Sequence, residues 1–301
     1  NLCRNFHALG SLSSVVDATE NGQSTARSIA PNAIVTDNFD DILSNDKIQG
    51  IALATPAETH AKLAIQSMLA GKDVFVEKPM ALSIEDAQAM QEIAIETDRI
   101  LMVGHLLEYH PAVLKLRELV GSGELGKINY VYSNRLNFGK VRTEENALWS
   151  FAPHDVAIIL RLLGQSPIEV SASGGSFLTE DIADITVSNL RFSDNSSAHI
   201  FVSWLHPYKE QRLVVIGDKK MAIFNDVNSF GEKLRVYPQT VEFDGTLPVL
   251  KKEDAEFIVH PDTEPLREEC AHFLECIKTR ENPLTDAQSG IEVLKVLHAS
   301  Q

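Results

Sequence analysis

The stretch Asp73-Val74-Phe75-Val76-Glu77-Lys78-Pro79 decides the fold of this chain. Its apolar run is typical of a strand buried on both faces, and Pro79 cannot donate to a ladder, so the strand should end near Lys78. Glu77 and Lys78 then lie at the carboxyl end of the strand, which is where ligands bind in open parallel α/β sheets. An ammonium group held there suits proton transfer. The alternative is a surface ion pair after the strand.

Composition and charge restrict the class of protein. The chain has 301 residues, 44% of them hydrophobic and 23% charged, which is ordinary for a soluble globular protein with room for a second domain. The formal charge of −15 opposes binding to nucleic acid or anionic membranes, and no apolar segment is long enough to span a bilayer. We expect no export signal, because no basic region followed by an apolar one opens the chain. Cys3, Cys270 and Cys276 lack metal-ligand or disulfide-framework spacing, which predicts reduced thiols in a cytoplasmic protein.

The first part of the chain alternates predicted strands and helices, as a wound α/β domain does. Strands are predicted over residues 12–16, 48–54, 73–78 and 99–103, and helices over 24–30, 39–43, 61–70 and 84–97. Ser83 and Asp86 form a capping-box variant that opens the last of these helices. Right-handed crossovers would bring the carboxyl ends of the strands together in one crevice.

Three glycines, Gly121, Gly123 and Gly126, mark a change of pattern, because they break the helix that follows Pro111. Beyond them the short connections predict an antiparallel sheet, with strands over residues 128–138, 168–176, 183–192, 196–204 and 212–216. Further helices are predicted over residues 154–163, 265–280 and 286–299. The predicted fold class is α/β, with a parallel-sheet domain followed by an α+β domain that holds a large, open, mainly antiparallel sheet.

Several motifs along the chain resemble one known family. They are Ala54-Thr55-Pro56 with His60, Gly71-Lys72-Asp73-Val74 leading into Glu77-Lys78-Pro79, and Asn282-Pro283-Leu284-Thr285-Asp286-Ala287. Together they resemble the glucose-fructose oxidoreductase, inositol dehydrogenase and rhizopine-catabolism (Gfo/Idh/MocA) family. Any one motif is weak, but their joint spacing over nearly the whole chain is specific.

Three further segments resemble a particular branch of that family, the one that oxidises the 3-hydroxyl of UDP-N-acetylhexosamines or their uronic acids. The segments are Leu106-Leu107-Glu108-Tyr109-His110-Pro111, Arg135-Leu136-Asn137-Phe138-Gly139 and Leu148-Trp149-Ser150-Phe151-Ala152-Pro153-His154-Asp155.

The resemblance implies two domains. Residues 1–124 would form a Rossmann domain that binds a nicotinamide dinucleotide. Residues 125–301 would carry the sugar and the subunit contacts, with the C-terminal helices packing back on the first domain. The family's first strand and Gly-rich loop are absent before the helix predicted at Asn1-Leu2-Cys3-Arg4-Asn5-Phe6. We expect a fragment of a longer product rather than damage to cofactor binding, because a sheet lacking its central strand would expose unpaired edges.

The cofactor contacts are predicted at strand ends. Asp17 ends a strand ahead of a helix, where an acid accepts hydrogen bonds from ribose hydroxyls and opposes a 2′-phosphate, so NAD is favoured over NADP. The alternative for Asp17 is a turn residue or a helix cap. The other predicted cofactor contacts are Thr55, Pro56, His60, Glu77, Lys78 and His105.

Lys78 and His154 are the predicted catalytic residues. A secondary alcohol that loses hydride must also lose its hydroxyl proton, and the resemblance places both side chains at the reacting carbon. His154 follows Pro153 at a predicted helix start, where the helix dipole favours the neutral, proton-accepting imidazole. We expect His154 to be the base and Lys78 to polarise the alkoxide, although the roles could be exchanged, and His154 has a buried or capping role as its alternative. Ser150 stands where many relatives carry an aspartate, which weakens a histidine-carboxylate dyad.

The substrate contacts are predicted on the strand and loop before His154. Two arginines there could clamp a diphosphate or a carboxylate, because the guanidinium fork matches those oxygens, and Trp149 could stack on a ring. The alternative is a solvated loop. The full predicted substrate set is Lys78, Tyr109, Arg135, Asn137, Arg142, Asn146, Trp149 and His154, with His105 and His110 as further candidates near the crevice.

No metal site is predicted, because the histidines and cysteines lack ligand spacing. The alternatives to a UDP-sugar dehydrogenase are an inositol or free-sugar dehydrogenase of the same family, or a non-catalytic protein that senses NAD or a nucleotide sugar. An open antiparallel sheet usually covers its outer face with a partner, so a homodimer or homotetramer is expected.

Overall fold

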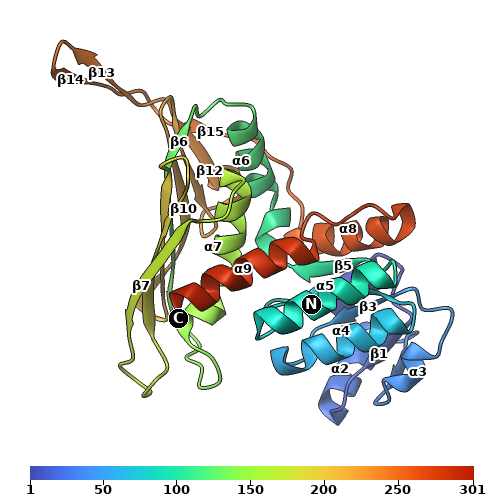
Figure 1. The fold of residues 1–301 in the computed structure, drawn as a ribbon. Coiled ribbons are helices and arrows are strands. Elements are labelled where there is room, and N and C mark those ends of the chain that lie inside the picture. The colour runs from blue at the N-terminus through green and yellow to red at the C-terminus, as the bar shows by residue number, and fades with distance from the viewer. The chain divides into compact units, whose positions relative to one another are not determined.

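The structure is a computed structural model that describes the chain from Asn1 to Gln301 (Figure 1). The chain forms two compact units. The first comprises Asn1–Tyr109 and Thr263–Leu294, and the second comprises His110–Asp262 and Lys295–Gln301. The division therefore falls after Tyr109, ahead of the predicted boundary at residue 124.

Parallel strands form the centre of the first unit. Strands β1 (Ser14–Val16) and β2 (Ile34–Thr36) pair with each other, and β3 (Gly50–Leu53), β4 (Asp73–Glu77) and β5 (Leu101–Gly104) form a second sheet in that order. The Rossmann-like parallel arrangement confirms the predicted fold class. Strand β2 was not predicted, and the strands fall into two sheets rather than one, because no strand of the chain pairs with both β1 and β3.

Helix α1 (Leu2–Ala8) precedes these strands along the chain, and the other helices of the first unit follow or connect them. They include α2 (Glu20–Ile29), α3 (Asp40–Leu43), α4 (His60–Leu69), α5 (Ile84–Glu96) and α8 (Pro265–Thr279), with short 3₁₀ turns η1 (Ala57–Thr59) and η2 (Leu106–Tyr109). The Ser83 hydroxyl accepts a hydrogen bond from the Asp86 amide at the start of α5, which confirms the predicted cap.

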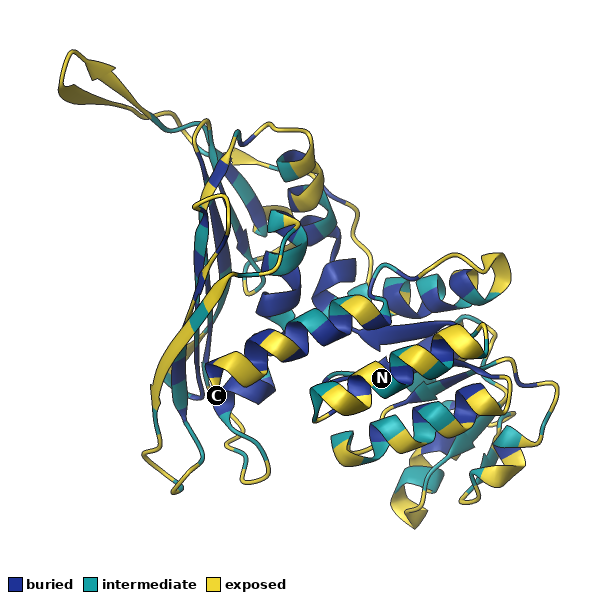
Figure 2. Cartoon of the chain, in the orientation of Figure 1, coloured by how far each residue is buried: buried dark blue, intermediate teal, exposed yellow.

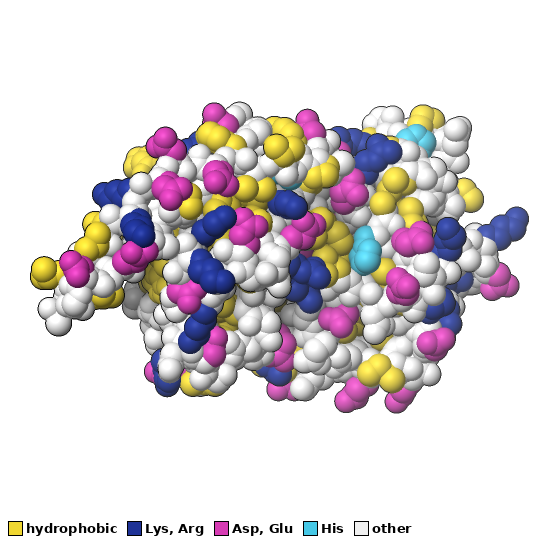
Figure 3. Space-filling model, turned by 90° about the horizontal axis from the view of Figure 1, so that it is seen from above, with side chains coloured by type: hydrophobic (Ala, Val, Ile, Leu, Met, Phe, Trp, Pro, Cys, Tyr) yellow, Lys and Arg dark blue, Asp and Glu magenta, His cyan; other side chains and the backbone are white.

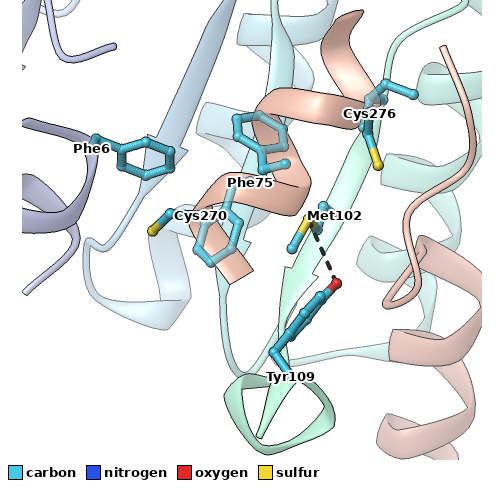
Figure 4. Close-up of a cluster of buried hydrophobic side chains, with 8 residues drawn as sticks. Phe6, Phe75, Met102, Tyr109, Cys270 and Cys276 are labelled. Carbon is cyan, nitrogen blue, oxygen red and sulfur yellow. Dashed lines mark hydrogen bonds between the residues drawn. The ribbon is translucent and has the colours of Figure 1, made fainter. Parts of the chain in front are cut away.

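The core of the first unit packs around β4. Val74, Phe75 and Val76 are fully buried, as the strand prediction requires. The rings of Phe6, Phe75 and Phe273 meet edge to face, with centroids 5.9–6.5 Å apart. Figure 4 shows Phe6 and Phe75 within this core. Helices α1 and α8 thereby become fixed to the sheet.

The Asn282–Ala287 motif lies against β5. The Thr285 carbonyl accepts a hydrogen bond from the Val103 amide at 2.8 Å, and Asp286 bridges to Met102. The motif therefore extends the edge of the parallel sheet just before helix α9 (Ala287–Ser300) begins.

The second unit is built on one eight-stranded sheet, whose order is β15-β12-β11-β10-β6-β9-β8-β7. The strands are β6 (Ile128–Phe138), β7 (Glu169–Gly175), β8 (Ile185–Arg191), β9 (Ser197–Ser203), β10 (Leu205–Gly217), β11 (Met221–Asn225), β12 (Leu234–Tyr237) and β15 (Glu256–Phe257). All neighbours are antiparallel except β6 and β9, which run parallel. The mainly antiparallel sheet confirms the prediction, although β11, β12 and β15 were not predicted.

One face of this sheet packs on helices α6 (Pro111–Gly121) and α7 (Ala147–Leu163) (Figure 1). Along β9 and β11, and over most of β6, buried residues that face the helices alternate with half-buried residues on the other side (Figure 2). We call that other side the outer face of the sheet.

Helix α7 begins earlier than predicted. It starts at Ala147, with Asn146 as its N-cap, and Pro153 lies inside it. The predicted start at His154 is therefore wrong. The helix dipole therefore does not favour a neutral His154 in the predicted way, because His154 lies in the body of the helix and not at its start.

A hairpin that was not predicted extends from the second unit. Strands β13 (Thr240–Asp244) and β14 (Leu247–Lys251) pair only with each other, after the short turn η3 (Phe230–Glu232) and strand β12. No helix anywhere in the chain combines the length and apolar character needed to cross a membrane.

Candidate active site

The carboxyl end of β4 holds the predicted catalytic lysine. Lys78 is half-buried directly after Glu77, and its backbone amide donates to the Glu77 carboxylate at 3.3 Å. A side chain at Gly104, at the end of neighbouring β5, would meet that carboxylate at 3.0 Å. Gly104 thus leaves room for the Glu77 carboxyl group beside the end of β5.

His60 ties two of the strand ends together. Its Nδ1 lies 2.9 Å from the carbonyl oxygen of Pro79 and its Nε2 lies 2.9 Å from that of Thr55, and the ring is 1% exposed. Carbonyl oxygens only accept hydrogen bonds, so a neutral imidazole can donate to one of them at a time. Because the ring is enclosed, the structure shows His60 as a buried bridge between the end of β3 and the residue after Lys78. It shows no surface of the ring that a cofactor could contact.

Three carboxylic acids interact beside this strand end. Glu108 in η2 and Glu269 in α8 are buried, and Glu77 is half-buried. Burial raises the pKa of Glu77, against the weaker opposing effects of the Lys78 amide and ammonium. Burial, and then the charges of Glu77 and Glu108, raise the pKa of Glu269 well above its usual range. Neither oxygen of Glu269 has a hydrogen-bond partner.

Sequence reasoning missed Glu108 and Glu269 as neighbours of the strand end. Glu269 comes from a helix near the other end of the chain, and a single acid on an amphipathic helix is normally solvated, so no local pattern marks it.

Asp17 follows β1 and opens the turn into α2. Its Oδ1 accepts hydrogen bonds from the Thr19 amide at 2.8 Å and hydroxyl at 2.7 Å, and these bonds lower the pKa of the carboxyl group. Thr19 is the N-cap of the helix, so the structure shows the turn role that was the alternative for Asp17. A side chain at Gly22 would lie 2.1 Å from the Asp17 carboxyl carbon. The glycine therefore provides the space in which this acid stays ionised at the end of a strand, and that placement fits a ribose-binding acid.

The remaining strand-end residues of the first unit differ in exposure. Thr55 and Pro56, after β3, are exposed, and the Thr55 and Thr59 hydroxyls lie 2.7 Å apart. His105, after β5, is buried, and its amide bonds to the Val103 carbonyl at 2.8 Å.

Tyr109 packs in the core of the first unit. Its hydroxyl lies 3.0 Å from the Thr285 hydroxyl and points toward the sulfur of Met102, and the residue is 4% exposed (Figure 4). Burial raises the pKa of this phenol. Because the hydroxyl is already paired inside the core, the predicted sugar contact has no support from this placement.

Arg135 in β6 forms a buried ion pair within the second unit. Its Nε and Nη2 reach the two oxygens of Asp155 on α7, at 2.6 and 3.2 Å, and the Ser133 hydroxyl donates to the same carboxylate. Burial alone would lower the pKa of Arg135, but the charge and hydrogen bonds of Asp155, together with the charge of Asp226, outweigh burial and the net shift is upward. This guanidinium holds α7 to the sheet, so the predicted phosphate clamp lacks one of its two arginines.

The other predicted substrate residues of β6 and its loop are more open. Asn137 is half-buried, with its amide group above Gly139. Arg142 is 35% exposed and pairs with Glu145 at 2.9 Å and with Glu144 at 3.5 Å. Arg142 is thus accessible to a ligand, which would have to displace two carboxylates.

Helix α7 supplies the last group. The Asn146 side chain accepts a hydrogen bond from the Trp149 amide at 3.1 Å, so it caps the helix. Trp149 is 8% exposed, its indole N–H donates to Gln301 at 2.7 Å, and its ring meets His298 edge-on. Both residues are thereby committed to structure, Ser150 is buried, and His154 lies half-buried further along the same helix.

His110, a further candidate, begins α6 in the second unit. Its Nδ1 accepts from the Ala112 amide at 3.1 Å and its Nε2 lies 3.6 Å from Asp226. Burial lowers the pKa of His110 to about 4 despite the Asp226 charge, so the ring stays neutral as a helix cap.

The structure thus brings together Thr55, His60, Glu77 and Lys78 in the first unit. In the second it links Arg135 to Asp155 and Asn146 to Trp149. Lys78 and His154 belong to different units, and their meeting at one carbon stays a prediction.

The first unit has parallel strands with the candidate site residues at their carboxyl ends, and the second unit has one large open sheet. This combination is typical of two-domain dinucleotide-dependent oxidoreductases. Comparison with known families agrees with this class. Residues 2–105 match the model described as "Oxidoreductase family, NAD-binding Rossmann fold", and residues 113–223 match the "GFO/IDH/MocA C-terminal domain". The chain belongs to the Gfo/Idh/MocA family of oxidoreductases.

Two similar proteins illustrate the range of reactions among the relatives of this chain. The chain is 28% identical over 232 residues to 2,7-anhydro-N-acetylneuraminate hydratase of Mediterraneibacter gnavus, covering 72% of this chain and 61% of the relative. It is 26% identical over 249 residues to UDP-N-acetylglucosamine 3-dehydrogenase of Acidithiobacillus ferrooxidans, covering 82% and 76%. Inositol dehydrogenases also occur among the relatives. The chain spans less than two thirds of the length of the first of these proteins.

The fold has solved counterparts. A putative oxidoreductase of Magnetospirillum magnetotacticum MS-1 superposes with a TM-score of 0.87 at 25% identity, covering 100% of this chain and 95% of that structure.

Proposed function

We propose that the chain is an NAD-dependent oxidoreductase that removes hydride from a secondary hydroxyl, at C3, of a sugar or UDP-sugar. The observation that carries the proposal is Lys78 at the carboxyl end of a fully buried parallel strand, in a chain that matches both family domains. The relative that oxidises C3 of UDP-N-acetylglucosamine supports the choice of substrate.

The residues of the first unit fit part of a nicotinamide dinucleotide. The Asp17 carboxylate, kept ionised by Thr19 and given room by Gly22, would accept hydrogen bonds from ribose hydroxyls and would repel a 2′-phosphate. Thr55 and Pro56 would border the groove. When bound, the dinucleotide supplies the hydride acceptor.

The chain's own chemistry is then proton transfer. The Lys78 ammonium would donate a hydrogen bond to the substrate oxygen and stabilise its developing negative charge. The His154 imidazole would accept the hydroxyl proton as the carbonyl forms. His60 acts through Lys78, because its contact with Pro79 fixes the backbone on which the lysine stands.

A second candidate reaction has one specific observation in its favour. The relative with 28% identity is named a hydratase rather than a dehydrogenase, and it acts on an anhydro sugar. The same lysine and histidine could move protons for such a reaction.

One experiment separates these functions. The chain is incubated with NAD or NADP and, in parallel, with UDP-N-acetylglucosamine, myo-inositol or 2,7-anhydro-N-acetylneuraminate, while nicotinamide fluorescence and product mass are followed. Reduced cofactor formed from the UDP-sugar with NAD supports the proposal. Turnover of the anhydro sugar without net reduction would move the assignment to the hydratase, and binding without turnover of any sugar would indicate the sensor.

A further inference from the structure

We infer that a small cavity in the second unit binds the phosphate group of a small metabolite between Arg212 and Arg235. The cavity lies on strands β10 to β12 and the loop that joins β11 to β12. None of the residues predicted to bind the cofactor or the sugar lines it. The inference therefore concerns a separate site and does not rest on the proposed function.

Three neighbouring strands near one edge of the sheet form the cavity. Ile223 and Asn225 belong to the half-buried, outward row of β11, whereas Phe224 between them is buried. Arg212 on β10 pairs with Asn225, and Arg235 on β12 pairs with Ile223. Paired residues of antiparallel strands point to the same side of a sheet, so the two arginines flank β11 on its outer side. The cavity measures about 170 Å³, which is room for more than a single water molecule.

Each arginine keeps one donor that the chain leaves unsatisfied. The Nε–H groups of Arg212 and Arg235 are buried and have no hydrogen-bond acceptor. The rest of each guanidinium is held in place, because Nη2 of Arg212 lies 2.6 Å from Glu210 and the Arg235 guanidinium stacks on the Phe257 ring, 4.7 Å from its centroid. A buried donor without an acceptor is unfavourable, so a ligand oxygen that accepts from it gains affinity.

One acid at the cavity is held only weakly. The chain has a formal charge of −15, and on the face drawn in Figure 3 basic side chains lie among acidic ones. At the cavity, Lys233 is paired closely with Asp226, at 2.5 Å. Glu232, in contrast, is 53% exposed and lies 3.7 Å from Nη2 of Arg235, which is beyond hydrogen-bond distance. An anion from solution can therefore replace the Glu232 carboxylate beside Arg235.

A phosphate group suits these donors better than a carboxylate group does. Its oxygens are arranged as a tetrahedron, so they can accept hydrogen bonds from two arginines on opposite sides of the cavity. A carboxylate presents both of its oxygens in one plane and on one side. Guanidinium groups also match phosphate oxygens in geometry and charge. Inorganic phosphate and phosphate esters share this chemistry, and the experiment distinguishes them.

The test measures the binding of inorganic phosphate, glycerol 3-phosphate and malonate by isothermal titration calorimetry at one fixed ionic strength. The full chain is used in the assembly that it forms in solution. Arg212→Met and Arg235→Met each remove one of the two donors, and Glu232→Gln removes the competing charge. The control Arg191→Met removes an arginine that pairs with Glu169 elsewhere in the same sheet.

We expect phosphate or its ester to bind the wild type, and each of the two arginine variants to raise Kd by about tenfold or more, because a charge-assisted hydrogen bond is lost. Glu232→Gln should lower Kd by about threefold, since an exposed carboxylate no longer competes for Arg235. Misfolding cannot imitate this gain in affinity. Arg191→Met should bind as the wild type does.

The ligand arms identify the source of the phosphate group. Tighter binding of glycerol 3-phosphate than of inorganic phosphate supports an ester, and the reverse supports free phosphate. The inference is overturned if neither phosphate binds at millimolar concentration, if all variants bind equally, or if malonate binds more tightly than both phosphates. Circular dichroism of each variant shows that the sheet remains folded.

Discussion

Lys78 is the residue on which the proposed chemistry depends most. The substitution Lys78→Met keeps the length of the side chain and removes the ammonium. We expect kcat/KM to fall by about 10²–10⁴, because one positioned proton-transfer or charge-stabilising group contributes roughly that much. Steady-state kinetics on the responsive sugar measures the loss. The exposed Lys62 on α4, changed in the same way, should leave kcat/KM unaltered. Normal activity of the Lys78→Met enzyme would remove Lys78 from the mechanism.

His60 tests whether the bridge between two strand ends positions the lysine. His60→Ala removes both contacts to carbonyl oxygens, and we expect a loss of about 1–3 kcal/mol in the free energy of unfolding together with a lower kcat. His60→Gln can restore one hydrogen bond. The informative measurement is kcat in folded protein well below the melting temperature. If His60→Ala changes only the melting temperature, the bridge is structural and does not position Lys78.

Glu269 predicts how stability varies with pH. Its pKa in the folded chain lies above the ordinary value of 4.5, because the carboxyl group is buried near two other acids. As the pH rises above that value, the unfolded chain loses this proton first, so the folded state becomes progressively less favoured until the folded pKa is passed. Urea denaturation at acidic and at neutral pH should show this decline. Glu269→Gln should flatten it and raise stability at neutral pH, whereas Glu275→Gln, an exposed acid on the same helix, should have neither effect.

At the scale of elements, the ion pair between β6 and α7 can be used to test whether Arg135 has a structural role or binds the substrate. Arg135→Met leaves Asp155 buried without its partner, and we expect the free energy of unfolding to fall by about 3–5 kcal/mol. Asp155→Asn should give a loss of the same kind. A folded Arg135→Met protein with unchanged stability and a raised KM for the UDP-sugar would instead indicate that Arg135 binds substrate. Denaturant titration and substrate kinetics on the same preparation provide both readings.

The elements that sequence predicted well are those with a strong local pattern. Strand β4 follows from Val74-Phe75-Val76 and Pro79, and α5 follows from its Ser83 cap. The start of α7 was missed because Pro153 normally breaks a helix, and here the helix continues through it from the Asn146 cap. The short strands β11 to β15 give too few alternating residues for a period to be recognised.

The site was predictable to the extent that its residues follow strand ends. Thr55, Glu77 and Lys78 lie where the pattern placed them, at the ends of β3 and β4. Arg135 could be placed on a strand, but the sequence does not reveal that its face turns toward Asp155. The same limit applies to Trp149, whose partner Gln301 is the last residue of the chain. Contacts between residues that are far apart in the sequence can be identified only from the folded structure.

For the whole molecule, the formal charge of −15 predicts a salt effect that identifies the substrate class. Raising the ionic strength from about 10 mM to about 150 mM shortens the screening length from about 30 Å to about 8 Å. An anionic UDP-sugar should then bind more readily, with KM lower by about two-fold or more, because repulsion by the acidic chain is screened. A neutral inositol should show no such change. Equal salt responses of the two ligands would contradict an anionic substrate.

The projecting hairpin also bears on how the protein behaves as a laboratory sample. Four apolar side chains, Val241, Phe243, Pro248 and Leu250, lie on one side of it, and three of them are more than half exposed. Exposed apolar surface of this kind promotes adsorption to tubes and filter membranes, so protein should be lost most readily from dilute solutions. A version of the chain trimmed at the hairpin tip should then be easier to store and to crystallise.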